Sequence, residues 1–163
     1  MTNQSNNLVA LKKVIAICED GFNVSIDSNL FRSDAWISLK GKWTSKVLME
    51  FYCRRQMQKV NKKSKRWEII NNGEIVFPYR DAQKRFKNEN GNSISTSTFA
   101  RALDELVEKG FIDIKYSGGG MEGDISKYSI SDRWKKYGTP EFVKKSRTKD
   151  TRKLGFKKKN ESH

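Results

Sequence analysis

A stripe of apolar residues at helical spacing marks one segment of the chain as a helix. The segment is "KWTSKVLMEFYCRRQMQKV", and its stripe falls at i, i+1, i+4 and i+5: Val47, Leu48, Phe51 and Tyr52. This spacing puts the four side chains on one face, as in a helix that packs against a core. We therefore predict a core-facing helix here.

A second stripe runs through "ISTSTFARALDELVEKGFI", residues 94–112. Its apolar members are Phe99, Leu103, Leu106 and Val107. Ser95 or Ser97 can accept a hydrogen bond from the free amides of the first turn, and Gly110 stands where a helix C-cap favours positive φ. The pattern predicts a capped helix over residues 96–109.

Alternating apolar and polar residues predict two β-hairpins. In "WEIINNGEIVFPY" two β-rich runs, residues 67–70 and 74–77, flank Asn-Asn-Gly, and Pro78 ends the second run. "FIDIKYS" and "ISKYSIS" alternate on either side of the glycine-rich "GGGMEGD". Between the two hairpins, "YRDAQKRF" reads as a short helix that precedes the helix of residues 96–109.

The N-terminal segment permits two interpretations. Leu8, Leu11, Ile15 and Cys18 fall at helical spacing, but "VIAIC" fits a strand equally well. Apolar residues then alternate over residues 22–26. Residues 8–18 are also a candidate surface for pairing with a second copy of the chain.

The order of predicted elements is helix, β-hairpin, helix, helix, β-hairpin. That order predicts an α+β fold of the winged helix-turn-helix type, in which residues 96–109 are the recognition helix and the last hairpin is the wing. We assign residues 1–30 to an N-terminal extension, 31–137 to the winged helix-turn-helix domain and 138–163 to a flexible basic tail.

Charge points to a polyanionic partner. The formal net charge of +14 on 163 residues is typical of a protein that binds nucleic acid. Residues 143–163 contain nine Lys or Arg and two acids, and a second basic cluster follows the first helix. Either run alone is also compatible with a solvated, disordered segment.

The sequence lacks the residues that several kinds of site require. Cys18 and Cys53 form no C-x-x-C pair, so we expect two small buried hydrophobes, with neither a disulfide nor a zinc site. The single histidine is His163, and no Walker-type or paired-carboxylate motif occurs. We predict no enzyme activity, no metal and no cofactor. Because there is no long apolar run and no signal-peptide pattern, we expect a cytoplasmic, nucleoid-associated protein with no membrane partner.

The glycines of the last hairpin spell a nucleotide-binding motif by coincidence. Gly118, Gly120 and Gly123 match G-x-G-x-x-G, but that motif needs a helix after it, and "DISKYSIS" alternates like a strand. We interpret these glycines as the tip of the wing, and no small-molecule ligand is evident.

"STSTFARALDELVEKGFIDI" followed by a glycine-tipped hairpin resembles the recognition helix and wing of bacterial winged-helix DNA-binding proteins. The wider set "SDAWISL", "KVLMEF", "NNGEIVFPYRDA" and "STFARALDELVEKGFI" resembles helix-turn-helix proteins of phage, plasmids and other mobile elements. The resemblance covers roughly residues 31–137. It implies that the first turn of the recognition helix enters the major groove of double-stranded DNA.

Site residues follow from that resemblance and from the basic clusters. The resemblance implies base reading by Thr96, Ser97, Thr98 and Arg101. Phosphate contacts are expected from the basic clusters, the wing and the tail: Arg54, Arg55, Lys62, Lys63, Lys115, Tyr116, Lys127, Lys144, Lys145 and Arg147. Two departures stand out: the loop of residues 87–94 is longer than a tight turn, and the wing tip carries Glu122 and Asp124, which repel phosphate.

Each choice has a structural alternative. The hydroxyl residues can simply cap and solvate the helix, and Arg101 can be solvated or paired with Glu105 at i+4. The functional expectation is a DNA-binding protein, either a transcriptional regulator or an accessory replication or maintenance factor of a mobile element. The alternative is a winged-helix protein-protein interaction module that its basic tail tethers nonspecifically to nucleic acid, favoured by the acidic later turns of the helix.

Overall fold

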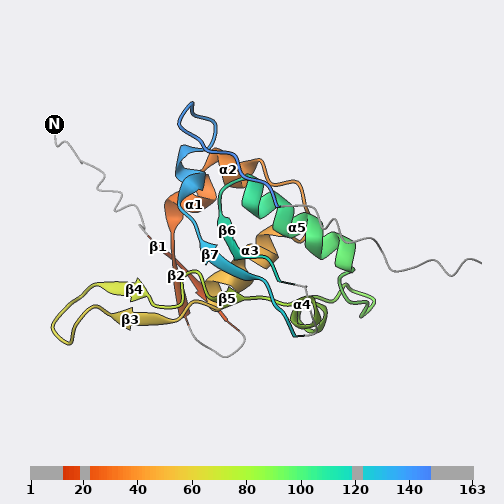
Figure 1. The fold of residues 1–163 in the computed structure, drawn as a ribbon, viewed down its shortest axis with the longest axis horizontal. Helices are drawn as coiled ribbons and strands as arrows, with labels where there is room; N and C mark the ends of the chain where they lie inside the picture. Colours follow the sequence, from red (N-terminus) through yellow and green to blue (C-terminus); the bar gives the residue numbers. More distant parts are fainter. Residues whose placement is uncertain (1–12, 19–22, 119–122, 148–163) are drawn as a thin grey trace, which may run out of the picture.

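A computed structural model describes residues 13–18, 23–118 and 123–147 of the chain (Figure 1). The fold is α+β, with short helices and small antiparallel sheets. The helices are α1 (Ser28–Arg32), α2 (Asp34–Ile37), α3 (Thr44–Cys53), α4 (Tyr79–Arg85), α5 (Thr96–Glu108) and the 3-10 helix η1 (Arg133–Lys136). The strands are β1 (Lys13–Ile17), β2 (Asn23–Asp27), β3 (Met57–Lys59), β4 (Trp67–Ile69), β5 (Ile75–Val76), β6 (Ile112–Tyr116) and β7 (Lys127–Ile130).

The core lies between α3, α5 and the central sheet. Both predicted apolar stripes are buried, so the helices that they predict are confirmed. Phe77 connects the two helices, because its ring meets Phe51 of α3 edge-on at 5.6 Å and Phe99 of α5 at 5.1 Å. Ile26 and Leu30 belong to the same core, which therefore begins earlier than the boundary predicted at residue 31.

The ends of α5 form as the sequence predicts. The Ser95 hydroxyl accepts a hydrogen bond from the amide of Thr98 at 3.2 Å, so Ser95 is the N-cap. At the other end Gly110 has φ +84°, its amide bonds the carbonyl of Val107, and the amide of Phe111 bonds that of Leu106. This is the Schellman motif. A Cβ on Gly110 would lie 2.8 Å from the amide nitrogen of Trp134, so glycine is also needed for space.

The central sheet has the strand order β5-β7-β6. Ile75 pairs with Tyr128 on one side of β7, and Ile112 pairs with Ile130 on the other. The hairpin predicted around "GGGMEGD" is confirmed as the β6–β7 pair, although residues 119–122 lie outside the described part. Because β7 and no helix follows Gly123, the glycines do not form the nucleotide-binding motif.

The hairpin predicted between residues 67–70 and 74–77 is wrong. β4 pairs with β3, at Lys59↔Trp67 and Met57↔Ile69, whereas β5 pairs with β7. The Asn-Asn-Gly turn between β4 and β5 separates the two sheets, because its two asparagine side chains bind different parts of the fold. Asn71 bonds the amide of Gln56 and the carbonyl of Arg54, while Asn72 bonds both backbone groups of Ile130.

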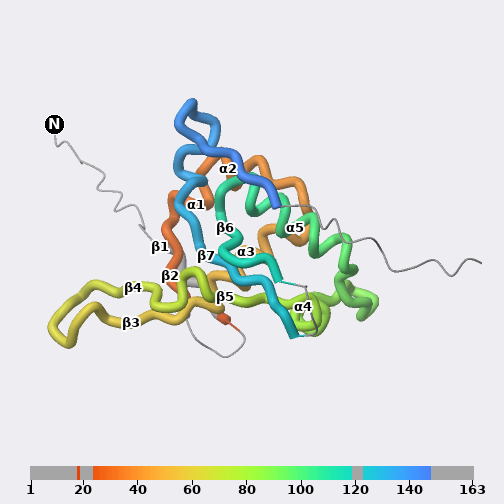
Figure 2. The backbone as a smooth tube through the Cα atoms, viewed as in Figure 1, coloured from red at the N-terminus to blue at the C-terminus, as the bar shows by residue number. Residues whose placement is uncertain are grey.

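Residues 56–70 therefore form a two-stranded arm, which we call the β3–β4 arm. It projects from one end of the long axis of the molecule (Figures 1 and 2). Its tip, residues 60–66, is the basic segment that the sequence placed after the first helix. Residues 56–63 and 65–68 are exposed, so the arm packs little of its surface against the body.

The long loop between α4 and α5 folds back on itself. The amide of Ile94 bonds the carbonyl of Phe86, and the amide of Asn88 bonds the carbonyl of Asn92, both at 2.9 Å. The Tyr79 hydroxyl of α4 donates to the carbonyl of Ile94 at 3.1 Å. The start of α5 is thereby fixed against α4 in spite of the extra residues.

Cys18 and Cys53 are joined in a disulfide, which contradicts the expectation of two free cysteines. Their Cα atoms are 5.7 Å apart, because Cys18 directly follows β1 and Cys53 ends α3. β1 pairs with β2, which decides the open N-terminal alternative in favour of a strand over residues 13–17; residues 8–12 lie outside the described part. No helix in the described residues is long and apolar enough to span a bilayer.

Candidate nucleic-acid interface

The first turn of α5 presents hydroxyl groups at the surface. Thr96 and Ser97 are exposed, and Thr98 is half-buried. Ser95 donates to the Thr98 hydroxyl at 2.8 Å, so that hydroxyl takes part in the cap. The Ser97 hydroxyl also lies at hydrogen-bond distance, 3.1 Å, from that of Ser95. By their exposure Thr96 and Ser97 are the better placed of the three to meet a ligand, next to backbone amides and the positive end of the helix dipole.

Arg101 lies one turn further along the same exposed face. It makes no hydrogen bond or ion pair with any residue that the structure describes, so its guanidinium is available. The alternative pairing with Glu105 is wrong, because the Glu105 carboxylate is turned towards the loop before α3. It accepts from the amides of Lys40 at 2.6 Å and Gly41 at 3.1 Å, and from the Thr44 hydroxyl at 2.6 Å.

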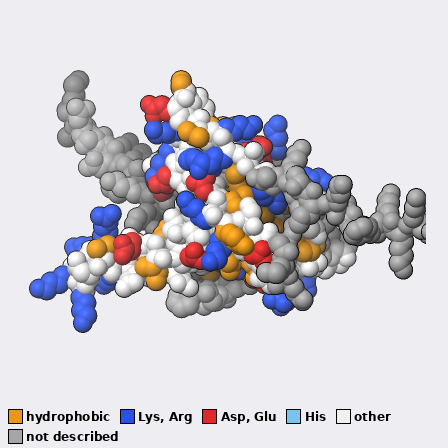
Figure 3. Space-filling view, in the orientation of Figure 1, with side chains coloured by type: hydrophobic (Ala, Val, Ile, Leu, Met, Phe, Trp, Pro, Cys, Tyr) orange, Lys and Arg blue, Asp and Glu red, His pale blue; other side chains and the backbone are white. Residues whose placement is uncertain are grey.

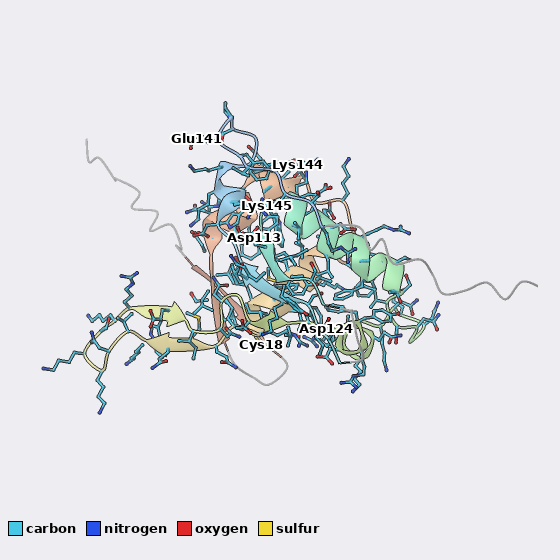
Figure 4. All side chains as sticks on the ribbon, in the orientation of Figure 1. Cys18, Asp113, Asp124, Glu141, Lys144 and Lys145 are labelled. Atoms are coloured by element: carbon cyan, nitrogen blue, oxygen red, sulfur yellow. A yellow bond between two sulfur atoms is a disulfide. The ribbon has the colours of Figure 1, made fainter. Side chains whose placement is uncertain are left out.

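The tail residues in the described part lie along the body. Arg147 binds Asp104 of α5 through two bonds of 2.7 and 3.2 Å, and Lys145 binds Asp113 at 3.1 Å. Figure 4 places Lys145 beside Asp113, with Lys144 near the same edge of the molecule. Lys144 is exposed and has no ion pair with the described residues. The tail is thus held to the body as far as Arg147.

The carboxylate of Asp113 in β6 binds both Lys145 and Arg133. Arg133 lies 2.8 Å from it, and the same guanidinium donates to the carbonyls of Val107, Ile112 and Val143. Burial alone would raise the pKa of Asp113, but the hydrogen bonds and charges of Lys145 and Arg133 lower it overall. Asp113 therefore stays ionised in the folded protein.

Residues of the β6–β7 hairpin, the predicted wing, mostly have local partners. Lys127 forms an ion pair with Glu74, and the hydrogen bond to Asp124 raises the pKa of Tyr116. Lys115 is exposed and lacks an ion pair among the described residues. Glu122 lies outside the described part. Of the predicted phosphate contacts on this hairpin, Lys115 is thus the one whose side chain is free of an ion pair with the described residues.

The side chains of Arg54 and Arg55 bind other parts of the fold. Arg54 bonds Glu50 and Asp81, both at 3.1 Å, and its guanidinium lies 4.3 Å from the centre of a core phenylalanine ring. Arg55 donates to the carbonyls of Tyr52 and Ser25, and burial lowers its pKa. Their donors hold α3 to α4 and to β2. Glu50 at i−4 from Arg54 was the one sequence signal of such a role.

Lys62 and Lys63 stand at the tip of the β3–β4 arm, where both are exposed. In the space-filling view, Lys and Arg side chains extend around this arm (Figure 3). The structure thus divides the predicted phosphate contacts. Lys62 and Lys63 on the arm, Lys115 and Lys144 are free of ion pairs within the described residues. The others bind residues of the chain itself, some of them at the surface.

No protein family, curated protein or solved structure that was compared with this chain matches it. Function is therefore inferred from the geometry and charge of the chain itself. Among the described residues no group of three or more His, Cys, Asp or Glu side chains is placed to hold a metal ion.

Proposed function

We propose that α3, β5, α4, α5, β6 and β7 form a winged helix-turn-helix unit that binds double-stranded DNA. The support is topological. Two helices precede α5 with β5 between them, two strands follow α5, and the sheet order is β5-β7-β6, so the strand after the first helix adds to the edge of the wing. In such a unit α5 is the recognition helix and the β6–β7 hairpin is the wing.

One observation carries the functional part of the proposal: the exposed first turns of α5. They combine the hydroxyls of Thr96 and Ser97 with the unpaired guanidinium of Arg101, on a chain of formal net charge +14. Hydroxyls at a helix N-terminus suit phosphate or base edges, and an exposed arginine can grip guanine O6 and N7. The biological role that fits is transcriptional regulation, or replication or maintenance of a phage, plasmid or similar element.

Replacing Arg101 with alanine is expected to reduce sequence preference at one base pair by about 1–3 kcal/mol. The arginine supplies a bidentate contact that alanine lacks, while its side chain packs against nothing that the fold needs. Duplexes are first selected from a random pool with the wild-type chain, and affinities are then measured on the selected site and on single base-pair variants of it.

Arg32→Ala is the matched control, because Arg32 is an exposed arginine on α1, outside the proposed interface. It removes the same charge and is expected to retain the preference. If Arg101→Ala kept both affinity and preference, base reading by Arg101 would be refuted.

The acidic later turns of α5 gave the main support to the protein-interaction alternative. Two of those carboxylates are engaged, Asp104 by Arg147 and Glu105 by the loop before α3. Glu108 alone of the three has no partner among the described residues, so these turns offer a partner protein little free negative charge. DNA binding remains the function that we propose.

Removing residues 148–163 separates the two functions. This deletion takes away six of the nine basic residues of the tail but retains the Arg147–Asp104 pair. We expect weaker binding with sequence preference intact, because the preference comes from α5. Competition between selected and scrambled duplexes measures it. Abolished binding with no residual preference would favour the tethered interaction module.

A further inference from the structure

The β3–β4 arm is a ribbon with no layer beneath it. All of β3 is exposed, and of β4 only Ile69 is half-buried. An isolated two-stranded hairpin gains little stability in water, because neither face buries apolar surface. Met57, Val60, Trp67 and Ile70 remain uncovered on it, with Trp67 at 53% exposure. By the register of the ladder Met57 and Trp67 lie on one face of the ribbon and Val60 and Ile70 on the other, so both faces of this projecting element offer apolar contact surface.

The charge of the arm is free to meet a ligand. Within residues 56–70 Glu68 is the single acid, and the basic residues are Lys59, Lys62, Lys63, Lys65 and Arg66. None of these cations forms an ion pair with a residue that the structure describes. This contrasts with Arg54, Arg55, Arg133 and Arg147, whose donors are used inside the molecule. Cations without an ion pair also lie elsewhere on the described body, among them Arg32, Lys40 and Arg101, but the arm groups five of them with a single acid in 15 consecutive residues.

The arrangement of these side chains suits nucleic acid. Lys59 and Trp67 are opposite each other in the ladder, and the Lys59 ammonium lies 5.6 Å from the centre of the indole ring. An exposed aromatic ring flanked by cations can lie against bases or sugars while the cations neutralise phosphates. The major groove also admits a two-stranded β-ribbon. An apolar membrane surface would not explain a tip that contains asparagine, serine and four cations.

The arm and the first turn of α5 lie far apart. Figure 1 shows the arm at one end of the long axis, whereas the N-terminal end of α5, next to α4, lies towards the other end. A helix in the major groove covers roughly one turn of duplex, about 10 base pairs. A duplex just long enough for α5 therefore leaves the arm without a ligand.

From these observations we propose that the β3–β4 arm is a second DNA-binding element, which takes a stretch of duplex separate from the stretch read by α5. This inference rests on the proposed function, since it presumes that α5 binds DNA. The arm supplies affinity that does not depend on sequence, and α5 supplies the preference.

The test compares two lengths of duplex that carry the selected site, one of about 12 base pairs and one of about 40 base pairs. The variant is Lys62→Ala/Lys63→Ala. On the long duplex we expect the slope of log affinity against log salt to fall by up to about 1.8, which corresponds to two lost phosphate contacts at about 0.9 each. On the short duplex we expect the wild-type slope, and on both we expect unchanged sequence preference.

Two control variants distinguish an effect of the arm from an effect of net charge, and thermal melting tests for an effect on folding. Lys40→Ala/Lys42→Ala removes two exposed lysines from the loop before α3 and is expected to retain the slope on both lengths. Lys62→Arg/Lys63→Arg keeps the charge at the tip and should also retain it. Thermal melting should be equal for all variants, because the two tip side chains contact no part of the core.

Three results would overturn the proposal. They are an unchanged slope for the arm variant on the long duplex, an equal loss on both lengths, or an equal loss in the Lys40→Ala/Lys42→Ala control. Arg101→Ala, measured in parallel, distinguishes this failure from failure of the proposed function. If Arg101→Ala has no effect while the arm variant loses slope, base reading by α5 fails and the arm remains a DNA-binding element.

Discussion

Arg133→Ala is expected to lower the free energy of unfolding by about 3–5 kcal/mol, the usual cost of removing one partner of a buried ion pair. Both Arg133 and Asp113 are largely buried, and the guanidinium also serves carbonyls at the end of α5, in β6 and in the C-terminal segment. Alanine removes all of these bonds at once, and Asp113 keeps only the more exposed Lys145 as a cationic partner. Urea denaturation of variant and wild type at pH 7 measures the loss.

The control for this prediction is Lys136→Ala, which removes a cation from an exposed pair with Glu141. Exposed pairs contribute roughly 0–1 kcal/mol, so this variant should be close to wild type. The two variants losing the same stability would refute the special role of Arg133.

The same ion pair predicts a pH dependence. Because the pKa of Asp113 is lowered in the folded protein, its contribution to stability is complete above the carboxyl pKa of the unfolded chain. It is lost as the pH falls through the lowered pKa of the folded state. The stability difference between wild type and Arg133→Ala should therefore shrink in acid.

Reduction of the Cys18–Cys53 disulfide is expected to cost about 3–4 kcal/mol in the free energy of unfolding. The bond closes a loop with a sequence separation of 35 residues, and its loss frees the unfolded chain. Denaturation with and without reductant gives the value. The double variant Cys18→Ala/Cys53→Ala should match the reduced wild type and should not respond to reductant.

Alkylation of the native protein tests whether the bond forms in solution. We expect no thiol to react before reduction and two to react afterwards. Two reactive thiols in the protein as isolated from an oxidising medium would refute the disulfide. Disulfides persist mainly in oxidising compartments, so a Cys18–Cys53 bond in the isolated protein would count against the expected cytoplasmic location.

Local patterns explain why much of the fold could be predicted. The stripe around Phe51, the N-cap at Ser95 and the glycine at Gly110 are features of short segments, and each corresponds to an observed element. The pairing of β3 with β4 could not be predicted in this way. Asn71 and Asn72 are good turn residues, but the side chain of Asn71 binds the segment before β3 and that of Asn72 binds β7, which no local pattern records.

The candidate site could also be predicted only where local sequence determines it. The exposure of Ser97 and Arg101 follows from the helical period, because they lie opposite the apolar stripe, whereas Thr96 is exposed as the first residue of the helix. The ties of Arg54 to Asp81 and of Arg147 to Asp104 join residues that are distant in sequence. A basic residue whose partner is brought in by tertiary folding cannot be distinguished from a free one by composition alone.

The Arg147–Asp104 ion pair has a consequence for how the rest of the chain is used. It holds Arg147, the last residue that the structure describes, against α5, and the described chain ends beside this helix in Figure 2. Six lysines and arginines follow Arg147 in sequence. A duplex held by α5 would meet them at a high effective concentration, as the second arm of a bivalent ligand does. The Arg147–Asp104 pair would thus couple DNA binding by α5 to DNA binding by these basic residues, and the overall affinity would exceed that of either alone.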